Sequence, residues 1–498
     1  MSLAPQTQAP LRNPDRFFIG GEWVSPSSDA MIDVIEPATE ELFFRVAEAK
    51  EADITRAIAA ARSAFDQGPW PRLSHGRRAE YLRAIASAVG ERVDDAGQIW
   101  PRESGVLHPI AQAMLRGIPG VYQFYADLAE NYPFEEPAQP TGGGEFGLLV
   151  REPVGVVGAI IPWNAPMSLI AYKLAPALLA GCTVVLKASP EAPGAAYLMA
   201  EVAEAVGLPA GVLNVVTADR EVSELLVRDP RVDKIAFTGS TAAGRRIASL
   251  CGERIARFTL ELGGKSAAVI LDDVDIAQTA ATLSQAECLL SGQICSSLTR
   301  IVVSRGRHDE LVDALASTFS QVRVGDPFDP QTQMGPLAMR RQRDRVEGYI
   351  AKGVAEGARL VTGGGRPKDL DRGFFIEPTV FAGVDNNCTI AREEIFGPVL
   401  SVIAAEDEAD AVNIANDTIY GLNASVFTDD LDRARAVAGQ LRSGTVGHNA
   451  FRTDFGVAFG GFKQSGIGRE GGREGLLAYL ETKTVILEGT PTAYQSGR

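Results

Sequence analysis

Cysteine is scarce in this chain and follows no recognisable pattern. The 498 residues include five cysteines, namely Cys182, Cys251, Cys288, Cys295 and Cys388. The number is odd, and neither a CxxC pair nor a cysteine–histidine cluster occurs, which argues against a disulfide framework and against a structural zinc site. We therefore expect no metal ion, and free thiols in a reducing, cytoplasmic compartment.

Positive charge is also in deficit. The formal net charge is −15, and so acidic a surface repels phosphate backbones and anionic lipids. Nucleic acid and membrane surfaces are therefore not expected partners. Residues 1–13 lack a basic start followed by an apolar run, so no signal peptide is predicted.

Long apolar runs are absent apart from one uncharged stretch, Val154 to Tyr172. Its length is close to that of a membrane-spanning helix, but Pro162, Asn164 and Pro166 interrupt its middle. We interpret it as a buried strand, a loop and the beginning of a helix.

The remaining composition is that of a soluble globular protein, with 45% hydrophobic and 22% charged residues. The length predicts two large domains or about three smaller ones. From Gly155 onward, continuous apolar runs alternate with helical segments, a pattern typical of parallel sheets covered on both faces. The first series of runs is Val156–Ile161, Thr183–Leu186, Leu213–Val216 and Lys234–Phe237. A second series follows the glycine pair Gly263-Gly264, a plausible hinge, at Ala267–Leu271, Arg300–Val303, Val399–Ile403, Ala424–Phe427 and Thr445–Val446.

Other segments flank these series. Phe17 to Trp23 predicts a short strand pair around two glycines, and Asp53 is a candidate N-cap. The helix after Asp53 would bury Ile54, Ala57, Ile58, Ala61 and Phe65. Residues 135–144 and the tail beyond Glu470 are polar and are candidates for arms that reach a partner subunit.

Two motifs follow apolar runs at one end of the first predicted sheet, where open parallel sheets bind ligands. In the first, residues 237–244, a glycine turn opens a helix whose N–H groups can hold a pyrophosphate, with Ser240 as a further donor. Its spacing is not GxGxxG, so an ordinary glycine-capped turn is an equal alternative. In the second, Lys187 can bond ribose hydroxyls or a phosphate; the alternative is a solvated surface lysine.

Three further residues carry possible acyl chemistry. Asn164 lies between two prolines and can stabilise an oxyanion, or it can bond its own backbone as turn asparagines do. Glu261 lies between leucines, where a raised pKa suits a general base; the alternative is a strand-edge glutamate facing solvent or an ion pair. Cys295 lies in a small-residue loop and would be nucleophilic with a lowered pKa; the alternative is a buried structural cysteine. None of the four histidines lies in a comparable motif.

Taken together and in this order, the five motifs resemble those of the aldehyde dehydrogenase superfamily. The resemblance extends over nearly the whole chain, from FIGGEW at 18–23 through EPAT at 36–39, EEIFGP at 393–398 and FGGFKQSG at 459–466 to ETKT at 481–484. The joint occurrence of the Glu261, Cys295 and Glu394/Phe396 motifs is highly specific, and it favours the functional interpretation of each motif.

The resemblance implies a role for each matching position. Cys295 matches the nucleophile, Glu261 the general base, and Asn164 the oxyanion donor that acts with the backbone N–H of Cys295. Lys173 and Glu470 match a proposed proton relay. The implied mechanism is thiolate attack on an aldehyde, hydride transfer to a nicotinamide, and hydrolysis of the resulting thioester.

The resemblance also implies the binding residues. Lys187 matches the residue that binds the adenosine ribose, Ser240 the pyrophosphate site, and Glu394 the residue that bonds the nicotinamide-side ribose. The full set expected at the cofactor is Ile161, Pro162, Trp163, Lys187, Ser189, Gly239, Ser240, Gly244, Leu262, Glu394 and Phe396. The set expected at the substrate is Ala165, Ser168, Leu169, Tyr172, Leu289, Ile294, Ser296, Arg452 and Phe459.

Several positions depart from the common family pattern. Pro190 stands three residues after Lys187, where many NAD-preferring members carry glutamate, and Glu191 follows one position later. NAD is therefore the expected cofactor, with NADP left open. Ala165, Ser168 and Leu289 each replace a bulkier residue, which predicts a wide tunnel for a large or aromatic aldehyde. Arg452 can meet a substrate carboxylate, although a rim ion pair is the favoured alternative.

The expected fold is α/β, with a Rossmann-type dinucleotide-binding domain (1–134 and 152–262), an α/β catalytic domain (263–470) and a small β oligomerisation element formed by arms 135–151 and 471–498. A homodimer or homotetramer is implied. A CoA-acylating semialdehyde dehydrogenase is the main alternative, but it would have no need of Glu261 to activate water. A thiol esterase would need no dinucleotide, and a non-catalytic protein of this fold would not need Cys295, Glu261 and Asn164.

Overall fold

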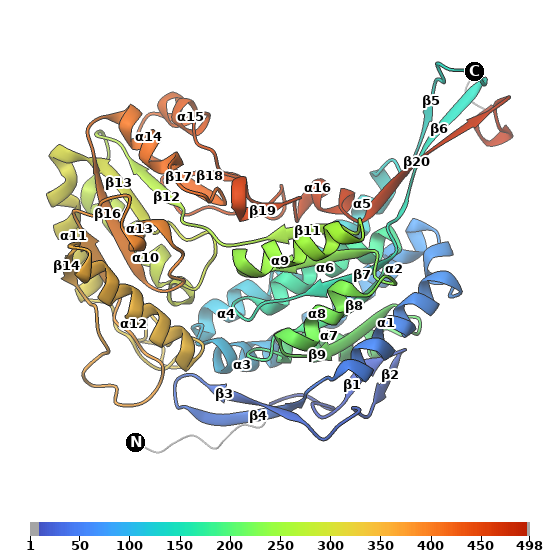
Figure 1. Ribbon diagram of the computed structural model, residues 1–498, viewed down its shortest axis with the longest axis horizontal. Helices are drawn as coiled ribbons and strands as arrows, with labels where there is room; N and C mark the ends of the chain where they lie inside the picture. The colour runs from blue at the N-terminus through green and yellow to red at the C-terminus, as the bar shows by residue number, and fades with distance from the viewer. Residues whose placement is uncertain (1–8, 496–498) are drawn as a thin grey trace.

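The computed structural model describes residues 9–495 as two α/β units and a projecting arm (Figure 1). The predicted strand pair at 17–23 is present, because β1 (Phe17–Ile19) and β2 (Glu22–Val24) are antiparallel around Gly20 and Gly21. Among residues 9–495 no helix is long and apolar enough to cross a membrane. The uncharged stretch instead supplies β7, a loop and the first turns of α6 (Pro166–Ala180), as expected.

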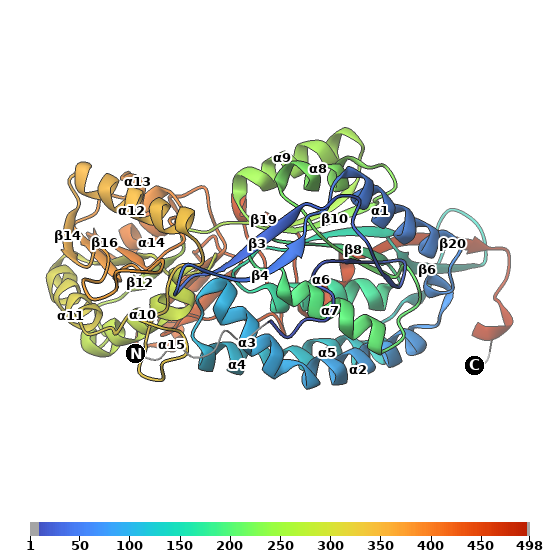
Figure 2. The same ribbon diagram turned by 90° about the horizontal axis from the view of Figure 1, so that it is seen from below.

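The first sheet has eight strands, and its five central strands are parallel. In spatial order they are β19 (Gly466–Ile467), β11 (Arg257–Glu261), β10 (Lys234–Thr238), β7 (Val156–Ile160), β8 (Thr183–Ala188), β9 (Leu213–Thr217), β1 (Phe17–Ile19) and β2 (Glu22–Val24). One hydrophobic core joins one face of this sheet to α2 (His75–Glu91), α3 (Val93–Ser104), α4 (His108–Leu115), α5 (Ile118–Asn131), α6 and α7 (Gly194–Ala205). A second core joins the opposite face to α1 (Glu51–Asp66), α8 (Arg220–Arg228) and α9 (Thr241–Glu253), so that helices cover both faces (Figure 2).

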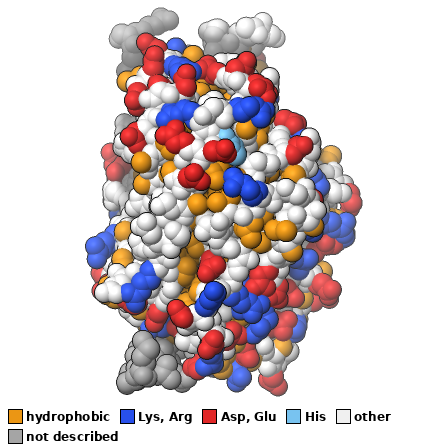
Figure 3. Space-filling model, turned by 90° about the vertical axis from the view of Figure 1, so that its left-hand side faces the viewer, with side chains coloured by type: hydrophobic (Ala, Val, Ile, Leu, Met, Phe, Trp, Pro, Cys, Tyr) orange, Lys and Arg blue, Asp and Glu red, His pale blue; other side chains and the backbone are white. Residues whose placement is uncertain are grey.

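The second sheet has seven strands, all parallel except the edge strand β14. Their order is β14 (Arg359–Thr362), β15 (Thr379–Ala382), β16 (Val399–Ala405), β13 (Arg300–Ser304), β12 (Ala267–Ile270), β17 (Asn423–Phe427) and β18 (Thr445–His448). The helices packed around it are α10 (Ile276–Cys288), α11 (His308–Ser320), α12 (Arg340–Ala355), α13 (Thr389–Arg392), α14 (Glu408–Asn416) and α15 (Leu431–Ala438). Figure 3 shows the end of the molecule that this unit forms, where acidic and basic side chains are interspersed around a band of apolar ones.

The arm is a three-stranded antiparallel sheet that projects from the body (Figure 1). Its strands are β5 (Glu135–Ala138), β6 (Phe146–Pro153) and β20 (Leu480–Leu487), the last following the short helix α16 (Gly472–Leu477). A separate hairpin of β3 (Met31–Glu36) and β4 (Glu41–Ala47) packs beside α3.

Two predicted boundaries do not coincide with these sheets. β19 lies inside the range 263–470 predicted for the catalytic domain, yet it pairs with β11 in the first sheet, because the chain returns across Glu261 at Gly466. β6 also runs past 151, where the arm was predicted to end. Residues 1–8 and 496–498 of the predicted ranges lie outside the described residues.

The prediction that Asp53 is an N-cap is wrong. Helix α1 begins at Glu51 with Lys50 as its N-cap, and Asp53 is the third helical residue. Its carboxylate accepts the backbone N–H of Lys50 at 3.0 Å, and both the N–H and the hydroxyl of Ser27 at 3.0 and 2.6 Å. An acidic residue at this position can reach back to the N-cap, which explains why the sequence alone left the start ambiguous. The buried face also ends at Ala64, with Phe65 only partly covered.

We expect Asp53→Ala to lower the stability of the fold by about 2 kcal/mol, because it removes a buried carboxylate that accepts hydrogen bonds from Lys50 and Ser27. Thermal unfolding measures the change. Glu51→Ala, at an exposed position in the same helical turn, is the control and should leave the midpoint unchanged. Equal midpoints for the two variants would contradict this account of Asp53.

Candidate functional site

Cys295 follows an abrupt reversal of the chain at the end of α10. Leu290, Ser291 and Gly292 have φ values of 48°, 55° and 70° in succession, and left-handed backbone is costly for the first two. Hydrogen bonds hold this conformation, because Ser291 Oγ donates to the Gly335 carbonyl at 2.8 Å and Asn423 Nδ2 donates to the Ser296 carbonyl at 3.1 Å. The reversal leaves Cys295 partly exposed, whereas Cys182, Cys251 and Cys288 are buried.

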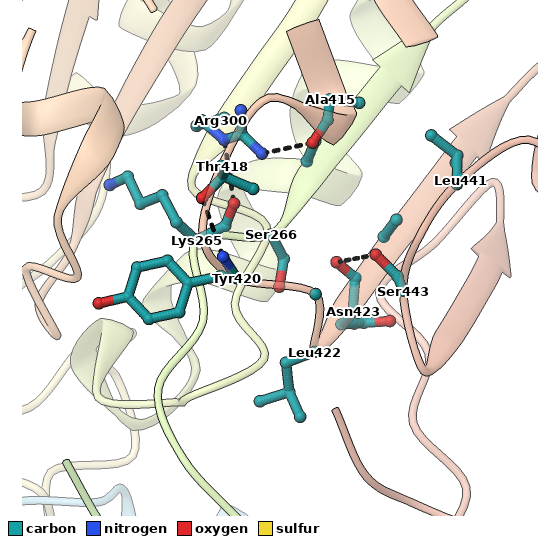
Figure 4. A pocket seen from close by; sticks show the side chains of 13 residues that line it. Lys265, Ser266, Arg300, Ala415, Thr418, Tyr420, Leu422, Asn423, Leu441 and Ser443 are labelled. Atoms are coloured by element: carbon teal, nitrogen blue, oxygen red, sulfur yellow. Dashed lines mark hydrogen bonds between the residues drawn. The ribbon is translucent and has the colours of Figure 1, made fainter. Parts of the chain in front are cut away.

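A cavity of about 10 Å³ lies behind this loop, beside the start of β12 (Figure 4). Asn423 and Ser266 line it, and Ser443 Oγ donates to the Asn423 carbonyl at 3.4 Å. Arg300 fixes the same region by donating to the carbonyls of Lys265, Ile414 and Ala415 at 2.9, 2.8 and 2.7 Å. The base of the loop at residues 289–296 that carries Cys295, here called the cysteine loop, is therefore anchored to the second sheet.

The glycine pair between the two sheets allows a close approach. A Cβ at Gly264 would lie 2.3 Å from the Cys295 carbonyl oxygen, and a Cβ at Gly263 would lie 2.4 Å from Glu394 Oε2. The Gly264 N–H also donates to Glu394 Oε1 at 3.2 Å. Residues with side chains would push the cysteine loop and Glu394 apart, so the pair has a steric role; hinge motion here stays a prediction.

Glu261 ends β11 in a buried position. The residue is 2% exposed, and neither carboxylate oxygen has a hydrogen-bond partner among the described residues. Burial, followed by the negative charge of Glu470, raises the pKa of Glu261 well above its usual range, and the charges of Lys173 and Arg469 oppose that rise. A solvent-facing glutamate is therefore excluded, and a group of this kind suits proton abstraction near neutral pH.

Lys173 and Glu470 form a buried ion pair beside Glu261. Lys173 on α6 donates to Glu470 Oε1 and, at 2.6 Å, to Thr238 Oγ1. Thr238 is the register partner of Glu261 across β10 and β11. Glu470 is held in turn by backbone hydrogen bonds with Phe459 at 2.7 and 2.8 Å. The structure thus brings together the residues predicted for a proton relay.

The thiol of Cys295 is also electrostatically linked to this cluster. Burial, and then the charges of Glu394 and Glu261, raise the pKa of Cys295. The sequence interpretation made a nucleophilic Cys295 conditional on a lowered pKa, and in the structure burial and the two carboxylates act in the opposite direction.

Asn164 lies across from the cysteine loop. Its side-chain Nδ2 donates to the Gln293 carbonyl at 3.0 Å, so it does not bond its own backbone as an ordinary turn asparagine would. The backbone carbonyl of Asn164 accepts the indole N–H of Trp100 at 3.0 Å, and the backbone carbonyl of Trp163 accepts the hydroxyl of Ser104 at 2.7 Å. The sequence did not single out Trp100 or Ser104, since nothing local to α3 signals these contacts.

Two parts of the predicted cofactor site, Lys187 at the end of β8 and the glycine turn before α9, are also well defined in the structure. Lys187 is 7% exposed at the end of β8, and burial lowers its pKa to about 8, which rules out a solvated surface lysine. Ile161 N–H donates to the Lys187 carbonyl at 3.1 Å. Ser189 donates to Glu191, which also pairs with Arg341 of α12.

At the glycine turn, Ser240 is the N-cap of α9 and accepts the N–H of Ala243 at 3.3 Å. Gly239 N–H donates to the Glu261 carbonyl at 3.0 Å, and a Cβ at Gly244 would lie 2.5 Å from Leu262 Cδ2. The turn therefore packs directly on the strand that carries Glu261.

Glu394 and Phe396 come from the second unit. Burial raises the pKa of Glu394 to about 7. Phe396 has a left-handed φ of 62°, and its backbone carbonyl accepts a hydrogen bond from Gln342 Nε2 at 2.6 Å. Its ring is nearly perpendicular to the Trp163 ring, with the two ring centroids 5.4 Å apart. Trp163, in the loop after β7, and Phe396, in the loop before β16, thus lie side by side.

Most predicted substrate residues cluster near these groups. Ala165, Leu169, Leu289 and Ile294 share one hydrophobic cluster, Ser168 is partly exposed, and Ser296 is buried. Tyr172 and Phe459 stack on either side of Phe455, with centroids 4.0 and 4.2 Å apart, and the sequence had not singled out Phe455. Arg452 is exposed, and the rim ion pair favoured for it does not occur within residues 9–495.

Comparison with known proteins places this arrangement. Residues 23–485 match the model of the aldehyde dehydrogenase family. A geranial dehydrogenase of Castellaniella defragrans is 46% identical, over 95% of this chain and 98% of its own. A 3-succinoylsemialdehyde-pyridine dehydrogenase of a Pseudomonas species is 42% identical, over 96% and 99%.

Solved structures agree with these relatives. The Mycobacterium tuberculosis aldehyde dehydrogenase complexed with NAD+ is 47% identical, with a TM-score of 0.92 over 95% of this chain and 98% of that one. A mutant of aldehyde dehydrogenase C from Pseudomonas syringae, complexed with NAD+ and octanal, is 40% identical, with a TM-score of 0.93 over 98% and 99%. Identity and structural similarity extend over nearly the full length of each protein, and the chain therefore belongs to the aldehyde dehydrogenase family.

Proposed function

We propose that this protein oxidises an aldehyde to a carboxylic acid with NAD+ through a covalent intermediate on Cys295. The observation that carries the proposal is geometric: the Cys295 backbone packs against the glycine pair that follows the buried Glu261, and the Asn164 amide is hydrogen-bonded two residues before Cys295. A nucleophile, a base and an oxyanion donor from three separate segments have no evident structural reason to converge.

In the proposed reaction, the Cys295 sulfur attacks the aldehyde carbon. The oxyanion accepts hydrogen bonds from Asn164 Nδ2 and the Cys295 backbone N–H, which stabilises the developing charge. The bound nicotinamide supplies the hydride acceptor. Glu261 then takes a proton from the water whose oxygen attacks the thioester carbon, the C–S bond breaks to return the Cys295 sulfur, and the carboxylic acid leaves. The proton then passes from Glu261 to Glu470, which Lys173 holds in place.

The residues present fit a dinucleotide. Lys187 offers a buried amine at the end of β8, and Glu394 offers a carboxylate beside Cys295. Solved relatives contain NAD+. The Glu191 carboxylate lies near Lys187, where its charge opposes the lowering of the Lys187 pKa by burial. Because a carboxylate there would repel a 2′-phosphate, we infer a preference for NAD over NADP.

A bulky apolar or aromatic aldehyde is the proposed substrate. Ala165 and Ser168 contribute little volume, and the Tyr172–Phe455–Phe459 stack presents aromatic surface nearby. The names of two relatives, geranial dehydrogenase and 3-succinoylsemialdehyde-pyridine dehydrogenase, refer to aldehydes of this size.

The arm supports assembly into a homodimer or homotetramer, and we propose a cytoplasmic location. Strand β20 pairs only on its β6 side, which leaves eight residues of one edge without a strand partner among residues 9–495. An edge of this length is a pairing surface for another chain.

Removing the nucleophile or the base should separate the two halves of the reaction. We expect Cys295→Ala to abolish aldehyde-dependent formation of NADH. Glu261→Gln should accumulate the acyl-enzyme, because a neutral amide cannot activate water. Intact-protein mass spectrometry after mixing with aldehyde and NAD+ detects that adduct. Cys388→Ala removes another partly exposed thiol and should keep full activity; steady turnover by Glu261→Gln without an adduct would argue against the assigned base.

The pH dependence of thioester hydrolysis should report on Glu470. Glutamate must be ionised to act as a base, so the rate falls as pH drops through the raised pKa of Glu261. Glu470→Gln removes a negative charge that raises this pKa and leaves Lys173 to lower it, so the acidic limb should move to lower pH. Glu474→Gln, at an exposed position of α16, is the control. A limb that stays in place or moves to higher pH contradicts the proposed coupling.

The substrate proposal is tested with a series of aldehydes, using NAD+ and NADP+ in parallel and following absorbance of the reduced nicotinamide. We expect long or ring-bearing aldehydes to give higher kcat/KM than acetaldehyde. Ala165→Phe should cost roughly tenfold or more in kcat/KM for the large aldehydes and little for acetaldehyde, because one pocket methylene is already worth 1–3 kcal/mol. A protein that favours acetaldehyde overturns the proposed substrate class.

A further inference from the structure

Helix α3 contacts residues 163–164, which include the proposed oxyanion donor, through two side chains on one face. Trp100 and Ser104 are four residues apart, so they project from successive turns of the helix. The indole N–H of Trp100 donates to the Asn164 carbonyl at 3.0 Å, and Ser104 Oγ donates to the Trp163 carbonyl at 2.7 Å. Two consecutive peptide groups of the loop before α6 are therefore held by one helix.

The side chain of Asn164 is held from the opposite direction. Its Nδ2 donates to the Gln293 carbonyl at 3.0 Å, two residues before Cys295. Gln293 is itself fixed, since its side-chain Oε1 accepts the Ala338 N–H at 3.0 Å. One of the two Asn164 Nδ2 protons is therefore hydrogen-bonded, and this bond fixes the direction of the other proton.

The segment that fixes Gln293 leads back to α3. A Cβ at Gly335 would lie 2.0 Å from the Gly105 carbonyl oxygen, and a Cβ at Gly105 would lie 2.3 Å from the Pro336 carbonyl oxygen. Gly105 directly follows Ser104 at the end of α3, with a left-handed φ of 76°. A continuous series of contacts therefore runs from α3 through Asn164, Gln293 and residues 335–338 and returns to α3.

We infer that Trp100 is a positioning residue for the reaction, whose indole N–H fixes the Asn164 amide relative to Cys295. This inference rests on the proposed function. The backbone carbonyl of Asn164 is bonded to α3, and its side-chain Nδ2 is bonded to the cysteine loop. The second Nδ2 proton is therefore held where the oxyanion forms. Preorganised donors stabilise a developing charge without reorganising, and a displacement of about 1 Å costs on the order of 100-fold in rate.

Trp100→Phe is the test, because it removes the N–H and keeps an aromatic ring. Trp70→Phe is the matched control: both tryptophans are buried, at 4% and 0% exposure, but the Trp70 indole N–H has no hydrogen-bond partner among residues 9–495. We expect Trp100→Phe to lower kcat at least tenfold, both for aldehyde oxidation and for hydrolysis of p-nitrophenyl acetate, with little change in KM or in NAD+ affinity. Trp70→Phe should match the unmodified protein.

A double-mutant cycle separates positioning from packing. In an Asn164→Ala background, Trp100→Phe should cost little more, because the donor it positions is already absent. Additive losses, or a Trp100→Phe enzyme with unchanged kcat, overturn the inference. If Trp100→Phe does not fold, Ser104→Ala is taken through the same cycle, with a smaller but equally non-additive loss expected. If Asn164→Ala itself leaves kcat unchanged, the oxyanion assignment in the proposed function fails instead.

Discussion

The close approach of two sheets at Gly263 and Gly264 is the constraint on which the site depends. β11 ends with Glu261, and the chain then passes through the glycine pair before β12 begins in the second sheet. The Cys295 backbone and the Glu394 carboxylate lie where side chains of these two residues would be. The base, the nucleophile loop and Glu394 therefore lie close together only because this short connection has no side chains.

This proximity places several ionisable groups in one desolvated space. Glu261, Glu394 and Cys295 each have a raised pKa, and the largest cause in each case is burial. The charges of Glu394 and Glu261 therefore oppose ionisation of the Cys295 thiol.

The sequence predicted most of the parallel strands because their signals are local, but it did not predict the hairpin of β3 and β4 or the strands β14 and β15. Apolar runs mark buried parallel strands, and Glu261 between two leucines indicates a desolvated carboxylate. Trp100, Ser104 and Phe455 were missed because their roles arise from contacts across 64, 59 and 283 positions of the chain, respectively with Asn164, Trp163 and Tyr172. The direction of the Cys295 pKa shift could not be predicted, because the loop composition gives no sign of Glu394 and Glu261 nearby. Strand β19 was not predicted, because two residues carry no periodic pattern.

The account's central claim is that the Cys295 thiol and the Glu261 carboxylate share one desolvated space. The most direct test is a difference titration of thiolate absorbance near 240 nm, comparing the protein with its Cys295→Ser variant, in the unmodified and Glu261→Gln backgrounds. The account predicts a pKa for Cys295 above the ordinary value of about 8.5, and a lower pKa when Glu261 is replaced by glutamine. An ordinary pKa that is unaffected by Glu261→Gln would contradict it.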